Sequence, residues 1–199
     1  MSRKKIIILT VLLLAVDQVV KILVKTHMTI DQHITVFHDW FFIRFIENPG
    51  AAFGMELGGD YGKLILSLFR IVAIVFLSWY INKLVNKKAP TGVIVGFALI
   101  LVGALGNVVD SAFYGLIFSE STFTSVATMF PEGGGYAGFL HGKVVDMLYF
   151  PLLNGTYPQW FPWVGGEHFV FFSPVFNISD SYISVGVIYM LLFQYKFFK

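Results

Sequence analysis

Long apolar runs alternate with polar segments along this chain. Four runs reach the length of about 20 mainly apolar residues that a membrane-spanning helix needs. We place these spans at about residues 6–24, 64–84, 91–114 and 179–198. The short basic loop "NKLVNKKAP" joins the second span to the third. The pattern therefore predicts a membrane protein with four transmembrane helices.

The two long segments between the spans, residues 25–63 and 115–178, follow other patterns. "ITVFHDWFFIRFIENPGAAFG" contains short alternating and aromatic runs, which are typical of small strands, and its "NPG" marks a turn. "NGTYPQWFPWVGGEHFVFF" is rich in Trp, Tyr and Phe, which favour the membrane interface. We expect one integral-membrane domain over residues 1–199, all-α in its spans, with small strands and loops outside the membrane.

The composition agrees with this interpretation. Hydrophobic residues make up 56% of the chain and charged residues 13%, against about 25% charged residues in soluble domains. The chain has no cysteine, which excludes disulfides and thiolate metal sites. The net charge of +2 indicates no role in nucleic-acid binding.

The first span has an alternative interpretation. "SRKK" followed by "IIILTVLLLAV" resembles a secretory signal peptide. "VDQVVK" follows it, without the small-residue pattern of a cleavage site. We therefore favour an uncleaved first helix.

The distribution of basic residues predicts the orientation. Short loops that are rich in lysine and arginine remain in the cytoplasm. With four spans, three basic groups fall on one side: Arg3, Lys4 and Lys5; Lys83, Lys87 and Lys88; Lys196 and Lys199. Both termini should be cytoplasmic, and residues 25–63 and 115–178 should lie outside.

Polar residues inside the spans are the candidates for function. Asp17 and Lys21 are four residues apart and share a helix face, so one interpretation is a structural ion pair. Asp17 lies roughly 16 Å along its span and Asp110 roughly 28 Å along the third, both towards the outer side. A polar packing seam on the third span, which also carries Asn107, is the structural alternative there.

The last span begins with Asn177 and Asp180, again at the outer end. Capping of the helix N-terminus is one interpretation of this pair. However, intramembrane acids are functional-site candidates by default, and Asp17, Asp110 and Asp180 reach one level from three spans. Asp146, in the apolar outer stretch "GKVVDMLYFP", is a fourth acid that we expect at that level.

Two carboxylates held close together suggest a specific chemistry. Both cannot ionise without a large free-energy penalty, so one keeps its proton. The ionised carboxylate can accept a proton from water while the protonated one polarises a peptide carbonyl. No HExxH zinc motif and no GxSxG elbow is present in the sequence, and we predict neither a metal nor a cofactor.

Five short motifs then resemble one family in order along nearly the whole chain: "DQVVK", "ENPGAAFG", "GALGNVVD", "KVVDML" and "FNISDSYISVG". They are similar to the motifs of the bacterial lipoprotein signal peptidases, also called type II signal peptidases. One departure is Ser111, where the family usually has arginine.

The resemblance implies an aspartyl endopeptidase of the bacterial inner membrane, with its active site at the periplasmic side. It implies four transmembrane helices with a small extracytoplasmic β-cradle, and cleavage of diacylglyceryl-modified prolipoproteins before the lipidated cysteine. Asp146 and Asp180 would be catalytic, and the supporting or substrate-binding residues would be Asn48, Gly50, Asn107, Asp110, Asn177, Asp17 and Lys21. We expect membrane lipid around a monomer.

Two other classes are less consistent with the sequence. A presenilin-type protease needs YD and GxGD on neighbouring spans, whereas "LGGD" here has the wrong spacing and lies outside a span. An ion-coupled transporter would be expected to show inverted repeats and broken helices, and we find neither pattern in the sequence.

Overall fold

Three long apolar helices form the body of the protein. The computed structural model describes residues 1–49 and 59–198. Within these residues, α1, α2 and the helix that begins with α3 are long and apolar enough to cross a membrane, which confirms the first three expected spans. The helices are α1 (Arg3–His27), α2 (Gly59–Asn86), α3 (Thr91–Val109), α4 (Gly115–Ile117) and α5 (Ile178–Phe193). A π-helical turn, Asp110–Tyr114, joins α3 to α4 without a break.

The last helix is shorter than the span predicted for it. α5 has 16 residues, or roughly 24 Å of helix, whereas the hydrocarbon core of a bilayer is about 30 Å thick. A 3₁₀ turn over Tyr195–Phe198 follows it, and the helix and turn together cover the expected segment 179–198. Hydropathy predicted an apolar segment here but not the change from α-helix to 3₁₀ helix within it.

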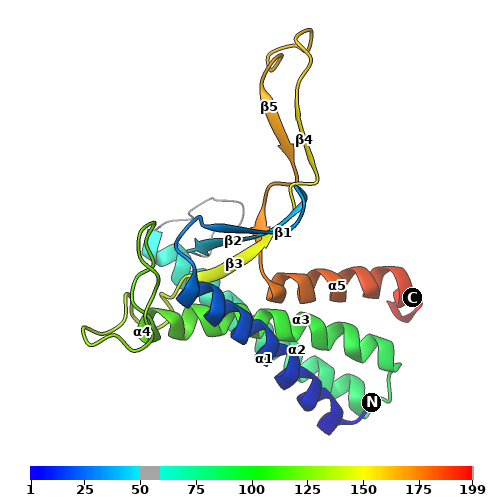
Figure 1. Ribbon diagram of the computed structural model, residues 1–199. Helices are drawn as coiled ribbons and strands as arrows, with labels where there is room; N and C mark the ends of the chain where they lie inside the picture. The colour runs from blue at the N-terminus through cyan, green and yellow to red at the C-terminus, as the bar shows by residue number, and fades with distance from the viewer. Residues whose placement is uncertain (50–58, 199) are drawn as a thin grey trace.

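α3 lies at the centre of the bundle and packs against α1, α2 and α5 (Figure 1). Small residues allow the close approach of α5, as is common in membrane helix pairs. A Cβ atom at Gly103 would overlap the carbonyl oxygen of Ser179, and one at Gly106 would overlap the hydroxyl of the same serine. A Cβ at Gly186 on α5 would lie 2.8 Å from the carbonyl oxygen of Gly96.

A four-stranded antiparallel sheet lies at the end of the bundle where α1 ends and α5 begins (Figure 1). Its strands, in spatial order, are β1 (His33–Phe37), β2 (Phe41–Asn48), β3 (Val144–Tyr149) and β6 (Val175–Phe176). The first two form in the segment where the alternating pattern predicted strands. Because β6 leads directly into α5, the sheet is joined to the start of that helix.

Apolar side chains hold the sheet against the helix ends. Phe45 and Met147 from the sheet are fully buried, in one cluster with Val24, Tyr114 and Phe118 from the helical body. β3 is buried along its first four residues. Asp146 is therefore an acid within an otherwise apolar strand, and it needs partners for its polar atoms.

A second, two-stranded sheet forms a hairpin that projects from the rest of the protein (Figure 1). It consists of β4 (Leu153–Thr156) and β5 (His168–Phe171). Trp160 and Trp163 in the connecting segment have exposed fractions of 79% and 98%. The aromatic-rich stretch of the sequence therefore forms a hairpin whose largest side chains face outwards.

The packing of α3 on α5 predicts the effect of adding one methyl group. Replacing Gly103→Ala should lower the free energy of unfolding by roughly 1–3 kcal/mol through overpacking, because the new Cβ meets backbone. This loss should occur although alanine is the better helix former by about 1 kcal/mol. Thermal unfolding in detergent micelles is the measurement.

Gly92→Ala is the matched control for this change. Its Cβ would meet only the ends of the Tyr189 and Gln194 side chains, which can move. It should therefore be much less destabilising. Equal stability of Gly103→Ala and the unchanged protein would contradict the close packing of α3 on α5.

Candidate active site

Asp146 lies on β3 with its carboxylate between two asparagines. Asn177 Nδ2 donates to Oδ1 at 2.7 Å, and Asn48 Nδ2 donates to Oδ2 at 3.2 Å. The residue is 3% exposed. β2 pairs with β3 so that Asn48 is opposite Val144, which brings the asparagine close to the acid. Pairing of the two strands thus joins side chains that lie 98 positions apart in the sequence.

Asp180 lies in the first turn of α5, and Asn177 is the cap of that helix. The Asn177 side chain accepts from the backbone N–H of Asp180 at 2.9 Å, and the Asp180 carboxylate accepts from the backbone N–H of Asn177 at 3.3 Å. This reciprocal arrangement is a capping box. Asn107 Nδ2 donates to the other oxygen of Asp180 at 2.8 Å. The capping interpretation is therefore correct, and it does not exclude a second role.

Asn177 and Asn107 connect the two carboxylates. Asn177 Nδ2 donates to both Asp146 and the side-chain oxygen of Asn107, the latter at 3.1 Å. Asn107 in turn donates to Asp180. Asp146 from a strand and Asp180 from a helix thus share one hydrogen-bonded group, which fixes how their carboxylates are oriented.

A buried ion cluster lies next to these asparagines. Lys21 Nζ lies 3.1 Å from Asp17 and 2.8 Å from Asp110, and all three side chains are fully buried. The same Nζ donates to the side-chain oxygen of Asn107 at 3.1 Å. Gln18 Nε2 donates to both aspartates at 3.0 Å. The Asp17–Lys21 ion pair expected from the sequence is therefore present, and it extends to Asp110.

Backbone groups complete the coordination of these two aspartates. Asp17 accepts from the N–H of Ser179 at 2.9 Å, and Asp110 accepts from the N–H of Val145 at 3.2 Å. Ser179 and Val145 are the neighbours of Asp180 and Asp146 in the sequence. The ion cluster therefore positions the backbone next to each of the two candidate catalytic acids.

Eight of the nine predicted site residues lie in two adjacent polar groups. Five of them form the hydrogen-bonded group just described: Asp146, Asp180, Asn48, Asn107 and Asn177. Asp17, Lys21 and Asp110 form the adjacent ion cluster. Gly50 lies outside the described residues.

The environment of Asp146 favours its protonated form. Burial raises the pKa of this carboxyl to about 7, and the negative charge of Asp180 adds to the rise. The hydrogen bonds from Asn177 and Asn48 act in the opposite direction. Asp180 is less buried, and two N–H groups donate to its carboxylate at the start of α5.

Ser111 occupies the position where the resemblance leads one to expect an arginine. Its hydroxyl donates to the backbone carbonyl of Asn107 at 3.0 Å, four residues earlier. Positive charge comes from elsewhere: Lys21 contacts Asn107 and Asp110, and Arg70 on α2 interacts electrostatically with Asp180, Asp146 and Asp110.

A second buried polar group lies next to this one, and the sequence pattern did not predict it. Lys25 on α1 forms an ion pair with Glu47, and Ser121 accepts from Lys25 at 3.0 Å and donates to Glu47 at 2.9 Å. Lys143 Nζ lies 3.4 Å from the other oxygen of Glu47. Glu47 directly precedes Asn48, so this group holds the strand that presents Asn48. Its members carry no shared periodicity that would have indicated contact.

The fold and the polar site together are typical of an enzyme embedded in a membrane. A bundle of apolar helices holds two carboxylates, a buried lysine and asparagines at one end, under a small sheet. The family described as signal peptidase (SPase) II matches residues 9–196. The chain therefore belongs to the signal peptidase II family of membrane-embedded peptidases.

Individual relatives agree with this assignment. A lipoprotein signal peptidase of Porphyromonas gingivalis is 53% identical over 191 residues, which cover 95% of this chain and 82% of the relative. One of Amoebophilus asiaticus is 35% identical and covers 92% of this chain and 75% of the relative. A bacterial membrane enzyme solved by the in meso method at 2.3 Å resolution has the same fold, with a TM-score of 0.62 at 23% identity over 98% of this chain and 89% of that one.

The Lys25–Glu47 ion pair allows a test of the second polar group. Replacing Lys25→Met leaves a buried carboxylate without its closest cation and should lower the free energy of unfolding by about 3–5 kcal/mol. The double variant Lys25→Met/Glu47→Met should recover most of that loss, because no unpaired charge remains buried. Thermal unfolding of the purified protein is the measurement.

An exposed ion pair provides the control. Arg44 Nη2 lies 2.6 Å from Asp31 Oδ1, and the two side chains are 33% and 50% exposed. Arg44→Met should therefore lower the free energy of unfolding by less than about 1 kcal/mol. If the double variant Lys25→Met/Glu47→Met is as unstable as Lys25→Met, an unpaired buried charge is not the cause of the lost stability.

Proposed function

We propose that this protein is an aspartyl endopeptidase that removes the signal peptide from diacylglyceryl-modified prolipoproteins, cleaving before the lipidated cysteine. The observation that carries the proposal is the sharing of Asn177 between Asp146 and Asp180. Membership in the signal peptidase II family and the names of the relatives support the substrate class.

Asp146 and Asp180 divide the chemistry between them. Asp180, held by two N–H donors at a helix start, is the ionised member and takes a proton from the attacking water. Asp146, whose pKa is raised by burial, is the protonated member and polarises the scissile carbonyl. Water adds to the carbonyl carbon while one of its protons goes to Asp180 and the proton of Asp146 goes to the carbonyl oxygen. Asp180 then gives its proton to the peptide nitrogen, the C–N bond breaks, and Asp146 takes a proton back from a hydroxyl of the intermediate.

The neighbouring polar residues hold this pair in position. Asn107 and Asn177 orient the carboxylates, and Lys21 fixes Asn107 through its side-chain oxygen. Asn48, which donates to Asp146, and Gly50, two residues later, would help to hold the substrate backbone. Asp17 and Asp110 act through the backbone of Ser179 and Val145 rather than on the substrate.

We propose that four spans place this site at the periplasmic side of the bacterial inner membrane. α5 with its 3₁₀ turn is the fourth span, and both termini are cytoplasmic. Basic residues without acidic ones at the end with the termini support this orientation. The lipid on the substrate cysteine then holds the scissile bond at the depth of Asp146 and Asp180, and a monomer is sufficient for the reaction.

Replacing the carboxylates one at a time tests the proposal. Asparagine keeps the shape of aspartate but can neither accept nor supply the proton, so Asp146→Asn and Asp180→Asn should each reduce cleavage by at least about a hundredfold. The double variant should be no slower than either single one, because the two act as a unit. The assay is release of the signal peptide from a purified diacylglyceryl-modified precursor.

Two controls belong to this experiment. Ser111→Ala removes only a hydroxyl that donates to a backbone carbonyl, so it should retain nearly full activity. Precursor without the lipid should be cleaved far more slowly by the unchanged protein. Normal turnover by Asp146→Asn would overturn the assignment, and Asp110 would then be the next partner to test for Asp180.

The raised pKa of Asp146 predicts how the rate depends on pH. The carboxyl keeps its proton below about pH 7 and loses it above. Because the protonated form is the active one, kcat/KM should fall about tenfold for each pH unit above that value. A rate that stays constant up to pH 9 would show that Asp146 is not the proton donor.

A further inference from the structure

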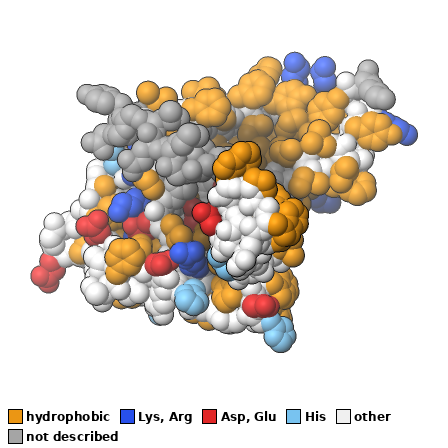
Figure 2. All heavy atoms as spheres, turned by 90° about the horizontal axis from the view of Figure 1, so that it is seen from above, with side chains coloured by type: hydrophobic (Ala, Val, Ile, Leu, Met, Phe, Trp, Pro, Cys, Tyr) orange, Lys and Arg blue, Asp and Glu red, His pale blue; other side chains and the backbone are white. Residues whose placement is uncertain are grey.

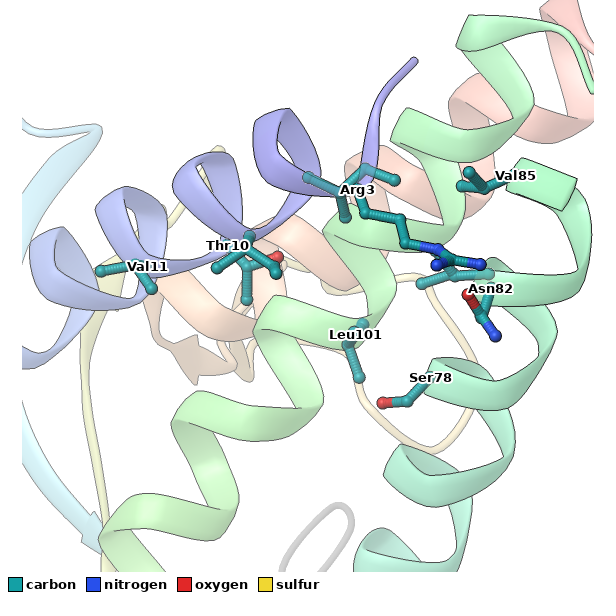
Figure 3. A pocket seen from close by; sticks show the side chains of 10 residues that line it. Arg3, Thr10, Val11, Ser78, Asn82, Val85 and Leu101 are labelled. Atoms are coloured by element: carbon teal, nitrogen blue, oxygen red, sulfur yellow. The ribbon is translucent and has the colours of Figure 1, made fainter. Parts of the chain in front are cut away.

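A cavity lies between α1 and α2 at the end of the bundle away from the acids. Its volume is about 320 Å³, at the lower end of the range for small-molecule sites. Figure 3 shows that α1 and α2 form its sides and that Leu101 of α3 contributes to its wall. Ile7, Val11, Ile81 and Val85 make most of the surface apolar. Both outer helices pack on α3, which leaves this groove between them.

Arg3 stands at the end of the groove that is nearest the N-terminus. Its side chain extends from α1 towards α2, as Figure 3 shows, and its Nη2 donates to Asn86 Oδ1 at 2.7 Å. A guanidinium has five N–H donors, so donors remain for an anionic oxygen. Arg3 is exposed, and an incoming group can therefore reach it.

The charges around this end favour an anion. The Arg3–Asn86 hydrogen bond brings the start of α1 next to the end of α2, and lysines flank both residues: Lys4, Lys5, Lys83, Lys87 and Lys88. Residues 1–16, 61–109 and 181–199 contain no aspartate or glutamate. On the face shown in Figure 2, the end on the right, where Figure 1 places both termini, shows basic side chains and no acidic ones.

The height of the groove matches one leaflet of a bilayer. On α1 its lining extends from Arg3 to Val11, which is roughly 12 Å of helix. Half of a hydrocarbon core is roughly 15 Å. An acyl chain can therefore lie in the groove while its phosphate remains at the level of Arg3. The substrate's diacylglyceryl group belongs to the other leaflet, beside Asp146 and Asp180.

We propose that this groove is a binding site for an anionic phospholipid, with one acyl chain between α1 and α2 and the phosphate at Arg3. The bound lipid fills the space between two helices that otherwise pack mainly on α3. The assignment to the cytoplasmic leaflet rests on the orientation given under the proposed function, whereas the site itself does not.

Lipid binding to the purified full-length protein in detergent tests this proposal. Phosphatidylglycerol and phosphatidylcholine with identical acyl chains are compared by native mass spectrometry. Loss of one basic contact near a membrane surface corresponds to roughly fivefold in affinity, so phosphatidylglycerol should bind at least that much more tightly. Arg3→Gln should remove most of the preference. Lys196→Gln, a charge change near the same end but outside the groove, should retain it.

Two further measurements separate the acyl chain from the headgroup. Ser78→Phe places a bulky side chain in the groove and should weaken both lipids. Glycerol 3-phosphate, which has no acyl chain, should not displace phosphatidylglycerol. Equal affinity for the two lipids, an unchanged preference in Arg3→Gln, or displacement by glycerol 3-phosphate would each overturn the proposal. Binding is the readout, so such a failure leaves the peptidase assignment unaffected.

Discussion

The structure depends on one constraint, which is that a lysine and two aspartates are kept out of water in an apolar bundle. Lys21, Asp17 and Asp110 have no exposed surface. Removing charges from water is strongly unfavourable unless every polar atom finds a partner. The partners here come from α1, α3, the start of α5 and β3, so all four elements meet around this cluster. The candidate catalytic acids, Asp146 and Asp180, are each next to one of these anchoring points.

The two ends of the helix bundle differ in charge. Paired acids, asparagines and the sheet lie at one end, and basic side chains surround an apolar groove at the other. The central helix α3 and the π-helical turn that follows it connect them: Asn107 and Asp110 belong to the acid end, while Leu101 lines the groove. The proposed substrate, a peptide, would meet the acid end, and the proposed lipid phosphate would meet the basic end.

Most of the helical spans and several residues of the candidate site could be predicted from the sequence, because charged residues are rare in apolar segments. Asp17, Lys21, Asp110 and Asp180 were visible as exceptions within hydrophobic runs, and three of the spans follow from hydropathy alone. The contact between Asn48 and Asp146 could not be predicted from the residues themselves, since it depends on the register of two strands far apart in the chain. The Lys25–Glu47 ion pair was missed for a different reason: in segments that are already polar, the sequence does not indicate which charges will be buried together.

Asn177 both caps α5 and orients Asp146, so opening of the helix end would affect the candidate site. The first turn of a helix is held by few bonds, and helix ends open more readily than the molecule as a whole. Here that turn carries Asp180, and its cap also orients Asp146. Fraying of a single turn would therefore dismantle the whole arrangement while the bundle remained folded. The hydrogen bond from the Ser179 N–H to buried Asp17 opposes this opening, so the ion cluster also protects the arrangement of Asp146 and Asp180.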